Sequence, residues 1–215
     1  MAESVLVPGD RDVRASLDRA GAGSNRIVVA CPPHPEHGGT RHDPRLTAVS
    51  DALVAAGVDC LRFDYGPWDE GRGERVDAGH AVAWSQGRYD RVGLFGYSFG
   101  AAIALLAAAE VEVDAVAALA PTASLGSNAN AGAVSDPDPA PTPAPDVVAA
   151  IEAIDAPVGI VYGERDSTVE WEPVVDRARE LGHRTEAVAA DHFFVGQHEA
   201  VAERVGSFLT DALRT

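Results

Sequence analysis

A strand, a sharp turn and a helix follow one another without interruption at residues 91–110, RVGLFGYSFGAAIALLAAAE. The turn has the pattern Gly-X-Ser-X-Gly, with Gly96 and Gly100 on either side of Ser98. Small residues at these two positions let a strand and the helix after it approach closely, and the central residue takes a strained backbone conformation. Strand and helix are both almost continuously apolar, which predicts burial on every side. The segment therefore favours an inner strand of a parallel sheet that helices cover on both faces.

Short apolar runs bounded by turn residues recur along the chain and alternate with helical patterns. We expect strands at Val5–Val7, Ile27–Cys31, Val58–Phe63, Val92–Tyr97, Ala115–Ala120, Val158–Tyr162 and Thr185–Ala189. We expect helices from Pro44 to the glycine at 57, and at Ser98–Ala109, Asp146–Ile154, Glu172–Leu181 and His198–Leu213. This alternation predicts an α/β fold with a doubly wound, mostly parallel sheet flanked by helices, and with an antiparallel ribbon formed by the first two strands.

The segment at residues 136–145, DPDPAPTPAP, has a proline at every second position and can form neither a helix nor a strand ladder. Only two expected strands and three expected helices follow it, too few to close a separate core. A chain of 215 residues is long enough for one well-buried core. We therefore expect a single domain over residues 1–215, with a proline-rich surface loop at 136–145.

The chain is strongly acidic, because 33 aspartates and glutamates stand against 17 basic residues, all of them arginine, for a net charge of −16. Such a surface repels nucleic acids and anionic membranes, so we expect neither as a partner. No apolar stretch reaches the roughly 18 residues of a membrane span. Cys31 and Cys60 lie in apolar runs, which indicates reduced thiols and a cytoplasmic location. The composition resembles that of haloarchaeal proteins, which implies a halophilic protein.

Ser98 is the candidate nucleophile, since the turn exposes its hydroxyl at a helix N-terminus, where negative charge is stabilised. Such a serine needs a histidine base and an orienting carboxylate, in the chain order serine, acid, histidine. Asp166 follows the strand PVGIVY, and His192 follows the strand TEAVAA. They are the expected acid and base. Glu164 is the alternative carboxylate, and helix capping is the alternative role of Asp166.

With these motifs the chain resembles the α/β-hydrolase family over about residues 25–212, in particular its small lidless members akin to dienelactone hydrolases and short-chain esterases. The segments GYSFG, GERD and ADHFF carry the resemblance. It implies an oxyanion hole, with one donor from the N–H of Phe99 and a second from the loop CPPHPEHGG. The three prolines of that loop have no N–H, so the second donor is Glu36 or His37, and Glu36 is preferred because it follows a His-Pro pair.

The resemblance also places His34 and Trp68 at the substrate pocket, although Trp68 could equally be a surface aromatic residue. Two departures bear on the substrate. Tyr97 precedes the serine where lipases commonly have histidine, and the proline-rich loop stands where relatives insert a helical lid. An open cleft suits small soluble acyl substrates.

We therefore expect a serine hydrolase that cleaves an ester or thioester of a small soluble substrate through an acyl-enzyme, with no cofactor. The alternatives are a noncatalytic binding protein of the same fold, and an acyltransferase or peptidase with the same triad. A metal site from His34, His37, His42 and Asp43 is less favoured, because zinc ligands are usually held on regular elements. Cys31 is a still weaker candidate nucleophile, since two prolines follow it and it has no base.

Overall fold

An eight-stranded sheet forms the centre of the protein in a computed structural model that describes residues 2–11, 13–21, 23–125 and 145–214. The strands are β1 (Glu3–Val7), β2 (Val13–Asp18), β3 (Arg26–Cys31), β4 (Asp59–Phe63), β5 (Arg91–Tyr97), β6 (Ala115–Leu119), β7 (Val158–Gly163) and β8 (Arg184–Val188). Their order across the sheet is β1-β2-β4-β3-β5-β6-β7-β8. The pairs from β4 to β8 are all parallel, whereas β1 and β2 run antiparallel at one edge.

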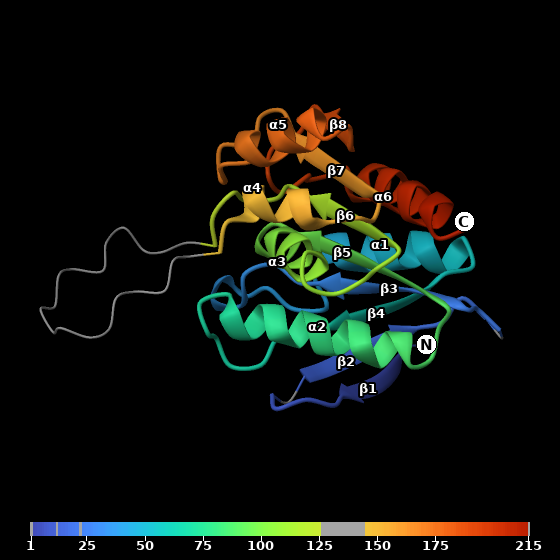
Figure 1. Ribbon diagram of the computed structural model, residues 1–215. Coiled ribbons are helices and arrows are strands. Elements are labelled where there is room, and N and C mark those ends of the chain that lie inside the picture. Colours follow the sequence, from blue (N-terminus) through green and yellow to red (C-terminus); the bar gives the residue numbers. More distant parts are fainter. Residues whose placement is uncertain (1, 12, 22, 126–144, 215) are drawn as a thin grey trace, which may run out of the picture.

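Helices cover both faces of this sheet. They are α1 (Pro44–Ala55), α2 (Arg72–Gln86), α3 (Phe99–Ala108), α4 (Val147–Ala150), α5 (Glu172–Glu180) and α6 (His198–Ala212), with short 3₁₀ turns η1 (Pro35–His37) and η2 (Ile151–Ala153). Figure 1 shows α2, α3 and α4 on one face and α1 and α6 on the other. Two separate core clusters correspond to these two faces. The doubly wound α/β fold expected from the sequence is confirmed.

The inner strands β5, β6 and β7 are almost wholly buried because nearly all their residues are apolar or glycine on both faces. Every residue of β6 and β7 is buried, and so is every residue of β5 after Arg91. Helix α1 begins where expected, since the Asp43 side chain accepts from the N–H of Arg45 and proline occupies the first helical position. In parallel sheets of this kind, ligands bind beyond the carboxyl ends of the strands.

The expected antiparallel ribbon was wrong in one of its two strands. Strand β1 pairs with β2, while β3 lies between β4 and β5 and is parallel to both. The sequence VRASLD of β2 did not read as an apolar run, because Arg14, Ser16 and Asp18 interrupt it. Its apolar residues alternate, as is usual for a strand near a sheet edge.

Helix α2 was not expected either. Its inward face includes the carboxylates of Glu74 and Asp77, which are buried and break the apolar period. Both are satisfied: Glu74 accepts the N–H groups of Asp69 and Gly71, and Asp77 accepts from Arg11 and from the N–H of Gly66. Buried charges of this kind need such partners. Of the expected proline-rich loop, residues 136–144 lie outside the described part of the chain.

Candidate active site

Ser98 lies between the last residue of β5 and the first residue of α3, with φ 58° and ψ −122°. The two flanking glycines permit this turn. A Cβ atom on Gly96 would lie 2.0 Å from the carbonyl oxygen of Gly100, and one on Gly100 would lie 2.2 Å from that of Cys31. Any side chain at either position would push α3 away from the sheet. The turn therefore holds the serine in the left-handed region, at the start of a helix and at the carboxyl end of the sheet.

His192 forms hydrogen bonds with both other candidate triad residues. Its Nε2 atom lies 2.9 Å from the Ser98 Oγ atom, and its Nδ1 atom lies 2.6 Å from Asp166 Oδ2. His192 is 4% exposed and Asp166 7%. The second oxygen of Asp166 accepts the N–H of Thr168 at 2.9 Å, which fixes the carboxylate. Glu164 is exposed and makes no hydrogen bond to His192 within the described residues.

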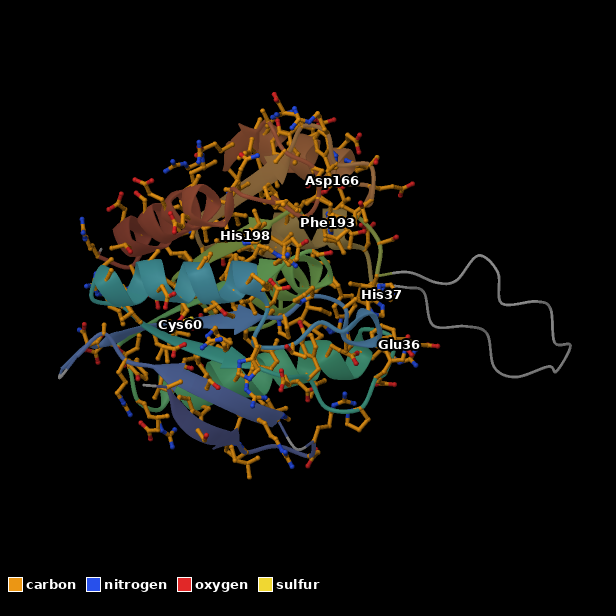
Figure 2. The ribbon with its side chains drawn as sticks, turned by 180° about the vertical axis from the view of Figure 1, so that it is seen from behind. Glu36, His37, Cys60, Asp166, Phe193 and His198 are labelled. Atoms are coloured by element: carbon orange, nitrogen blue, oxygen red, sulfur yellow. The ribbon has the colours of Figure 1, made fainter. Side chains whose placement is uncertain are left out.

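Parallel strand ends explain how residues so distant in sequence meet. Ser98, Asp166 and His192 each follow a strand of the parallel part of the sheet, namely β5, β7 and β8, and the loop that contains Glu36 follows β3. The carboxyl ends of parallel strands meet at one edge. Figure 2 shows Asp166 and Phe193 on the same side of the molecule as His37 and Glu36, with Cys60 on the opposite side.

The two expected oxyanion donors are both N–H groups without an acceptor in the described structure. Phe99 is the first residue of α3, where helical N–H groups have no intrahelical partner. In η1 the N–H of His37 donates to the carbonyl of His34 at 3.1 Å, whereas that of Glu36 donates to no described residue. The contact of Gly100 with the Cys31 and Pro32 carbonyls packs the start of α3 directly against this loop.

An aromatic cluster lies beside the Ser98 turn. The ring of His34 stacks on His37 with 4.4 Å between centroids and lies 4.5 Å from Trp68 and 4.9 Å from Phe99. Phe99 is buried, while His34 and Trp68 are half-buried and His37 is exposed. The structure thus brings both expected pocket residues next to the residue that follows the serine. The Tyr65 hydroxyl donates to the Pro32 carbonyl at 3.2 Å and anchors the same loop.

Burial lowers the pKa of His34 below its usual value, and the neighbouring His37 lowers it further. The Nδ1 atom of His34 is buried and has no hydrogen-bond partner among the described residues. A buried polar atom without a partner is unusual. The surroundings of the imidazole therefore disfavour its protonated form, and rings rather than hydrogen bonds hold its position.

A family model for the dienelactone hydrolase family matches residues 70–202, which is more than half of the chain. The chain belongs to the dienelactone hydrolase family. The match includes Ser98, Asp166 and His192. Membership of this family makes the protein a hydrolase of the α/β fold. A comparison with curated proteins found no match.

Solved structures are similar to this family member over nearly their whole length. An alpha-beta serine hydrolase homologue from Coxiella burnetii is 25% identical, with 96% of this chain and 97% of that chain covered and a TM-score of 0.76. A dienelactone hydrolase from Anabaena variabilis is 22% identical, with 100% and 99% covered and a TM-score of 0.76. A serine hydrolase without a lid from Xanthomonas campestris is 21% identical, with 99% and 94% covered and a TM-score of 0.73. The last two support the fold alone.

Two less favoured interpretations of the sequence were a metal site and a cysteine nucleophile. The described residues contain no group of three or more His, Cys, Asp or Glu side chains arranged to hold a metal ion, and Asp43 instead pairs with Arg45. Cys31 is fully buried below the turn, and burial raises the pKa of its thiol. A thiol that stays protonated is a poor nucleophile. Cys60 is also buried and free.

A hollow in the described structure lies away from the Ser98 turn. It measures about 460 Å³, and its lining includes Glu3, Arg19, Trp84, Arg88 and Tyr89. Tyr89 precedes β5, so the hollow is near the amino end of that strand, whereas Ser98 follows its carboxyl end. None of the candidate site residues lines it. Among the residues that the structure describes, no helix combines the length and apolar character needed to cross a bilayer.

Three further side chains near the site were not predicted from the sequence. Phe193 is 49% exposed, and its ring meets that of His192 edge-on at 5.4 Å. Tyr65 holds the loop after β3, and Tyr97 donates to the backbone of His192. Phe193 and Tyr97 each directly adjoin a triad residue in the sequence, which is the one signal that could have pointed to them.

Proposed function

We propose that the protein is a serine hydrolase that cleaves an ester or thioester of a small soluble substrate through an acyl-enzyme on Ser98. The observation that carries this proposal is the continuous chain of hydrogen bonds from Ser98 through His192 to Asp166, at 2.9 and 2.6 Å. A serine hydroxyl is a weak nucleophile unless a base accepts its proton, and the base must itself be oriented by a third group.

His192 acts as the general base. With its ring proton on Nδ1, the imidazole donates to Asp166, and Nε2 is left to accept the hydroxyl proton of Ser98. Asp166 keeps that tautomer in place and stabilises the imidazolium that forms. The burial of both residues strengthens this interaction, because water competes little for their polar atoms.

The N–H groups of Phe99 and Glu36 stabilise the developing oxyanion. Both lack a protein acceptor among the described residues, so the new negative charge competes with no existing hydrogen bond. His192 then returns its proton to the leaving alcohol or thiol, and Ser98 carries the acyl group. Water, deprotonated by His192, attacks the acyl carbonyl, and the acid is released as Ser98 recovers its proton.

The exposure of the surrounding residues supports a small, soluble substrate. Ser98 is half-buried rather than enclosed, and Phe193 beside the base is 49% exposed. His34 and Trp68 lie next to Phe99 and offer aromatic surface near the reacting carbonyl. We assign them to the substrate pocket, where apolar and aromatic groups usually provide most of the contact area.

A fluorophosphonate probe and a series of p-nitrophenyl esters of increasing chain length, both in molar salt, test the proposal. We expect the probe to label Ser98 covalently and the shortest esters to be hydrolysed fastest. Ser98→Ala should abolish both reactions, whereas Ser4→Ala, which changes an exposed serine on β1, should change neither.

Four outcomes would contradict the proposal in different ways. Labelling that survives in Ser98→Ala would exclude Ser98 as the nucleophile. No labelling of the folded wild-type protein would favour a noncatalytic binding protein. Products that partition to an added amine or alcohol rather than to water would favour an acyltransferase, and cleavage of peptides but not of esters would favour a peptidase.

A further inference from the structure

Tyr97 directly precedes the candidate nucleophile but belongs to the interior of the protein. It is the last residue of β5, is 2% exposed and packs in the core cluster on the α1 and α6 side of the sheet. Burial raises the pKa of its phenol well above the ordinary value. The hydroxyl is therefore protonated near neutral pH, where it can donate a hydrogen bond.

The acceptor of that hydrogen bond is the main-chain carbonyl of His192. The Tyr97 hydroxyl lies 3.1 Å from it, in a buried interaction that joins residues 95 positions apart. The two rings are 5.4 Å apart. One tyrosine thus connects the turn that holds the nucleophile to the loop that holds the base.

Other described hydrogen bonds that hold the backbone of the His192 loop from outside end on neighbouring residues. The N–H of Arg165 donates to the Ala190 carbonyl at 3.0 Å, and His198 Nε2 lies 3.2 Å from the Phe193 carbonyl oxygen. The Asp191 side chain accepts the N–H groups of Phe193 and Phe194, but these are contacts within the loop. Phe194 has a positive φ of 51°, which is unfavourable for a residue other than glycine and persists only where neighbouring contacts hold it. The Tyr97 hydroxyl fixes the carbonyl of the base residue itself from outside the loop.

Tyr97 is in turn held by a second contact. The guanidinium of Arg45, on α1, lies 4.4 Å from the centroid of the Tyr97 ring. Arg45 pairs with Asp43 at 2.6 Å, so its position is set at the start of the helix. A cation over an aromatic face attracts the ring and restricts its movement.

We propose that Tyr97 is a positioning residue: its hydroxyl holds the backbone of His192 so that the imidazole stays within hydrogen-bond distance of Ser98. This inference rests on the proposed function of Ser98, His192 and Asp166. Its physical basis is that small displacements of a base from its nucleophile lower the rate strongly. Packing alone would not require a hydroxyl here, because phenylalanine fills nearly the same space.

Tyr97→Phe tests the role of the hydroxyl, and Tyr162→Phe is its matched control. Tyr162 is also a buried tyrosine near the end of a strand and also has an arginine, Arg179, over its ring, but its hydroxyl accepts from Arg179 instead of bonding to the base loop. Each variant loses one phenol hydrogen bond, which is buried for Tyr97 and partly buried for Tyr162, so their effects on stability should be of similar size.

We expect Tyr97→Phe to lower kcat about tenfold, the factor that corresponds to about 1.4 kcal/mol, and to leave KM within about twofold. The rate of labelling by the fluorophosphonate should fall by a similar factor. Tyr162→Phe should keep both rates. Circular dichroism and thermal unfolding of each variant show whether the fold is retained.

Proton NMR distinguishes a positioning role of Tyr97 from a purely structural one. The short bond between His192 Nδ1 and Asp166 should produce a far-downfield proton resonance in the wild type. We expect this resonance to broaden in Tyr97→Phe, because a looser loop lets the proton exchange with water, and to be unchanged in Tyr162→Phe.

The proposal is overturned if Tyr97→Phe keeps the wild-type kcat and resonance, or if Tyr162→Phe loses as much as Tyr97→Phe. Neither result affects the triad, because Ser98→Ala would still abolish labelling. If the wild type itself is not labelled, the proposed function fails instead, and the NMR comparison then still reports on the hydrogen bond to His192.

Discussion

The two sides of the Ser98 turn are built in different ways. On the acid–base side, which we define as Asp166, His192 and their loops, the polar side-chain atoms of these two residues bond to one another, to Ser98 or to the backbone at 2.6 to 3.4 Å. On the oxyanion side, which we define as residues 32–39 with Trp68 and Phe99, side chains meet mainly as rings. There Glu36 N–H and His34 Nδ1 have no protein partner within the described residues.

This difference indicates which half is complete before substrate arrives. The acid–base side already satisfies its own hydrogen bonds, so it needs no reorganisation to accept a proton. The oxyanion side keeps donors without protein acceptors. The unpartnered polar groups at the buried Phe99 and at His34 cost stability until something binds them. We interpret the first as a prebuilt proton relay and the second as the part that a substrate completes.

The largest effect should come from the acid–base side. Asp166→Asn keeps the shape of the carboxylate but donates from its amide, which favours the wrong tautomer of His192. We expect kcat to fall on the order of 10⁴-fold, as is found when this carboxylate is replaced in a serine triad. Steady-state kinetics with a p-nitrophenyl ester measures it.

Glu164→Gln is the matched control, two residues earlier in the same loop. Glu164 is exposed and makes no hydrogen bond to His192 in the described part of the chain, so kcat should stay within about twofold of the wild type. A large loss in Glu164→Gln with none in Asp166→Asn would show that the wrong carboxylate has been assigned to the base.

The residues of the acid–base side could be predicted from the sequence because they directly follow strands of a parallel sheet. Once β5, β7 and β8 are expected to be parallel, residues just past their ends must lie together, and Ser98, Asp166 and His192 occur there in the required order. The geometry required no knowledge of side-chain contacts. The choice between Asp166 and Glu164 did, since it depends on the turn from Gly163 to Asp166.

The oxyanion side was harder to predict, because its contacts are not periodic. The stacking of His34 on His37 depends on a loop conformation that the sequence pattern does not encode. The same holds, on the acid–base side, for the hydrogen bond of Tyr97 to His192. Helix α2 was missed for a related reason: its buried face uses Glu74 and Asp77, whose partners come from distant segments. Residue patterns predict apolar burial well and buried polar networks poorly.

The close packing of Gly100 against the loop after β3 offers the next test of how the two sides of the Ser98 turn differ. Gly100→Ala would place a Cβ atom 2.2 Å from the Cys31 carbonyl oxygen and 2.3 Å from that of Pro32, so the start of α3 and the loop after β3 must separate. We expect roughly 1–3 kcal/mol of destabilisation, as for other overpacked sites. We also expect kcat to fall at least tenfold, because the two oxyanion donors move apart.

Gly79→Ala on α2 is the control, since its Cβ atom would meet only Val111, at 4.0 Å. Alanine is the better helix former there and should stabilise the protein by about 0.5–1 kcal/mol. If Gly100→Ala unfolds at the wild-type urea concentration with normal kcat, close packing between the turn and the oxyanion side is not needed.

Salt should change the stability of the protein, through its surface charges, more than it changes the reactivity of the site. With 33 acidic and 17 basic residues, surplus carboxylates repel one another over about 30 Å at very low ionic strength and over only about 3 Å at 1 M. Exposed ion pairs such as Arg214 with Asp211 weaken with salt, but such pairs contribute little. We therefore propose that the protein is halophilic and expect the melting temperature to rise by several degrees from dilute buffer to molar KCl.

The buried bonds of the triad are screened much less than the surface. Among molecules that are folded at both salt concentrations, the rate of Ser98 labelling should therefore change less than stability does. A melting temperature that stays flat or falls with KCl would refute the halophilic interpretation and leave the site unaffected.

The smallest effect should come from His34, through pH. Its pKa is lowered in the folded protein, first by burial and then by His37, so the unfolded chain binds a proton more readily than the folded one. Stability from this group is therefore present above its usual pKa of 6.5 and decreases as pH falls below that value. The melting temperature of His34→Gln should fall less between pH 7.5 and pH 5.5 than that of the wild type does.

His42→Gln, at an exposed position of the same loop, is the control and should behave like the wild type. If His34→Gln shows the wild-type pH dependence, the unpartnered imidazole costs nothing on protonation, and the oxyanion side is less constrained than its ring contacts indicate.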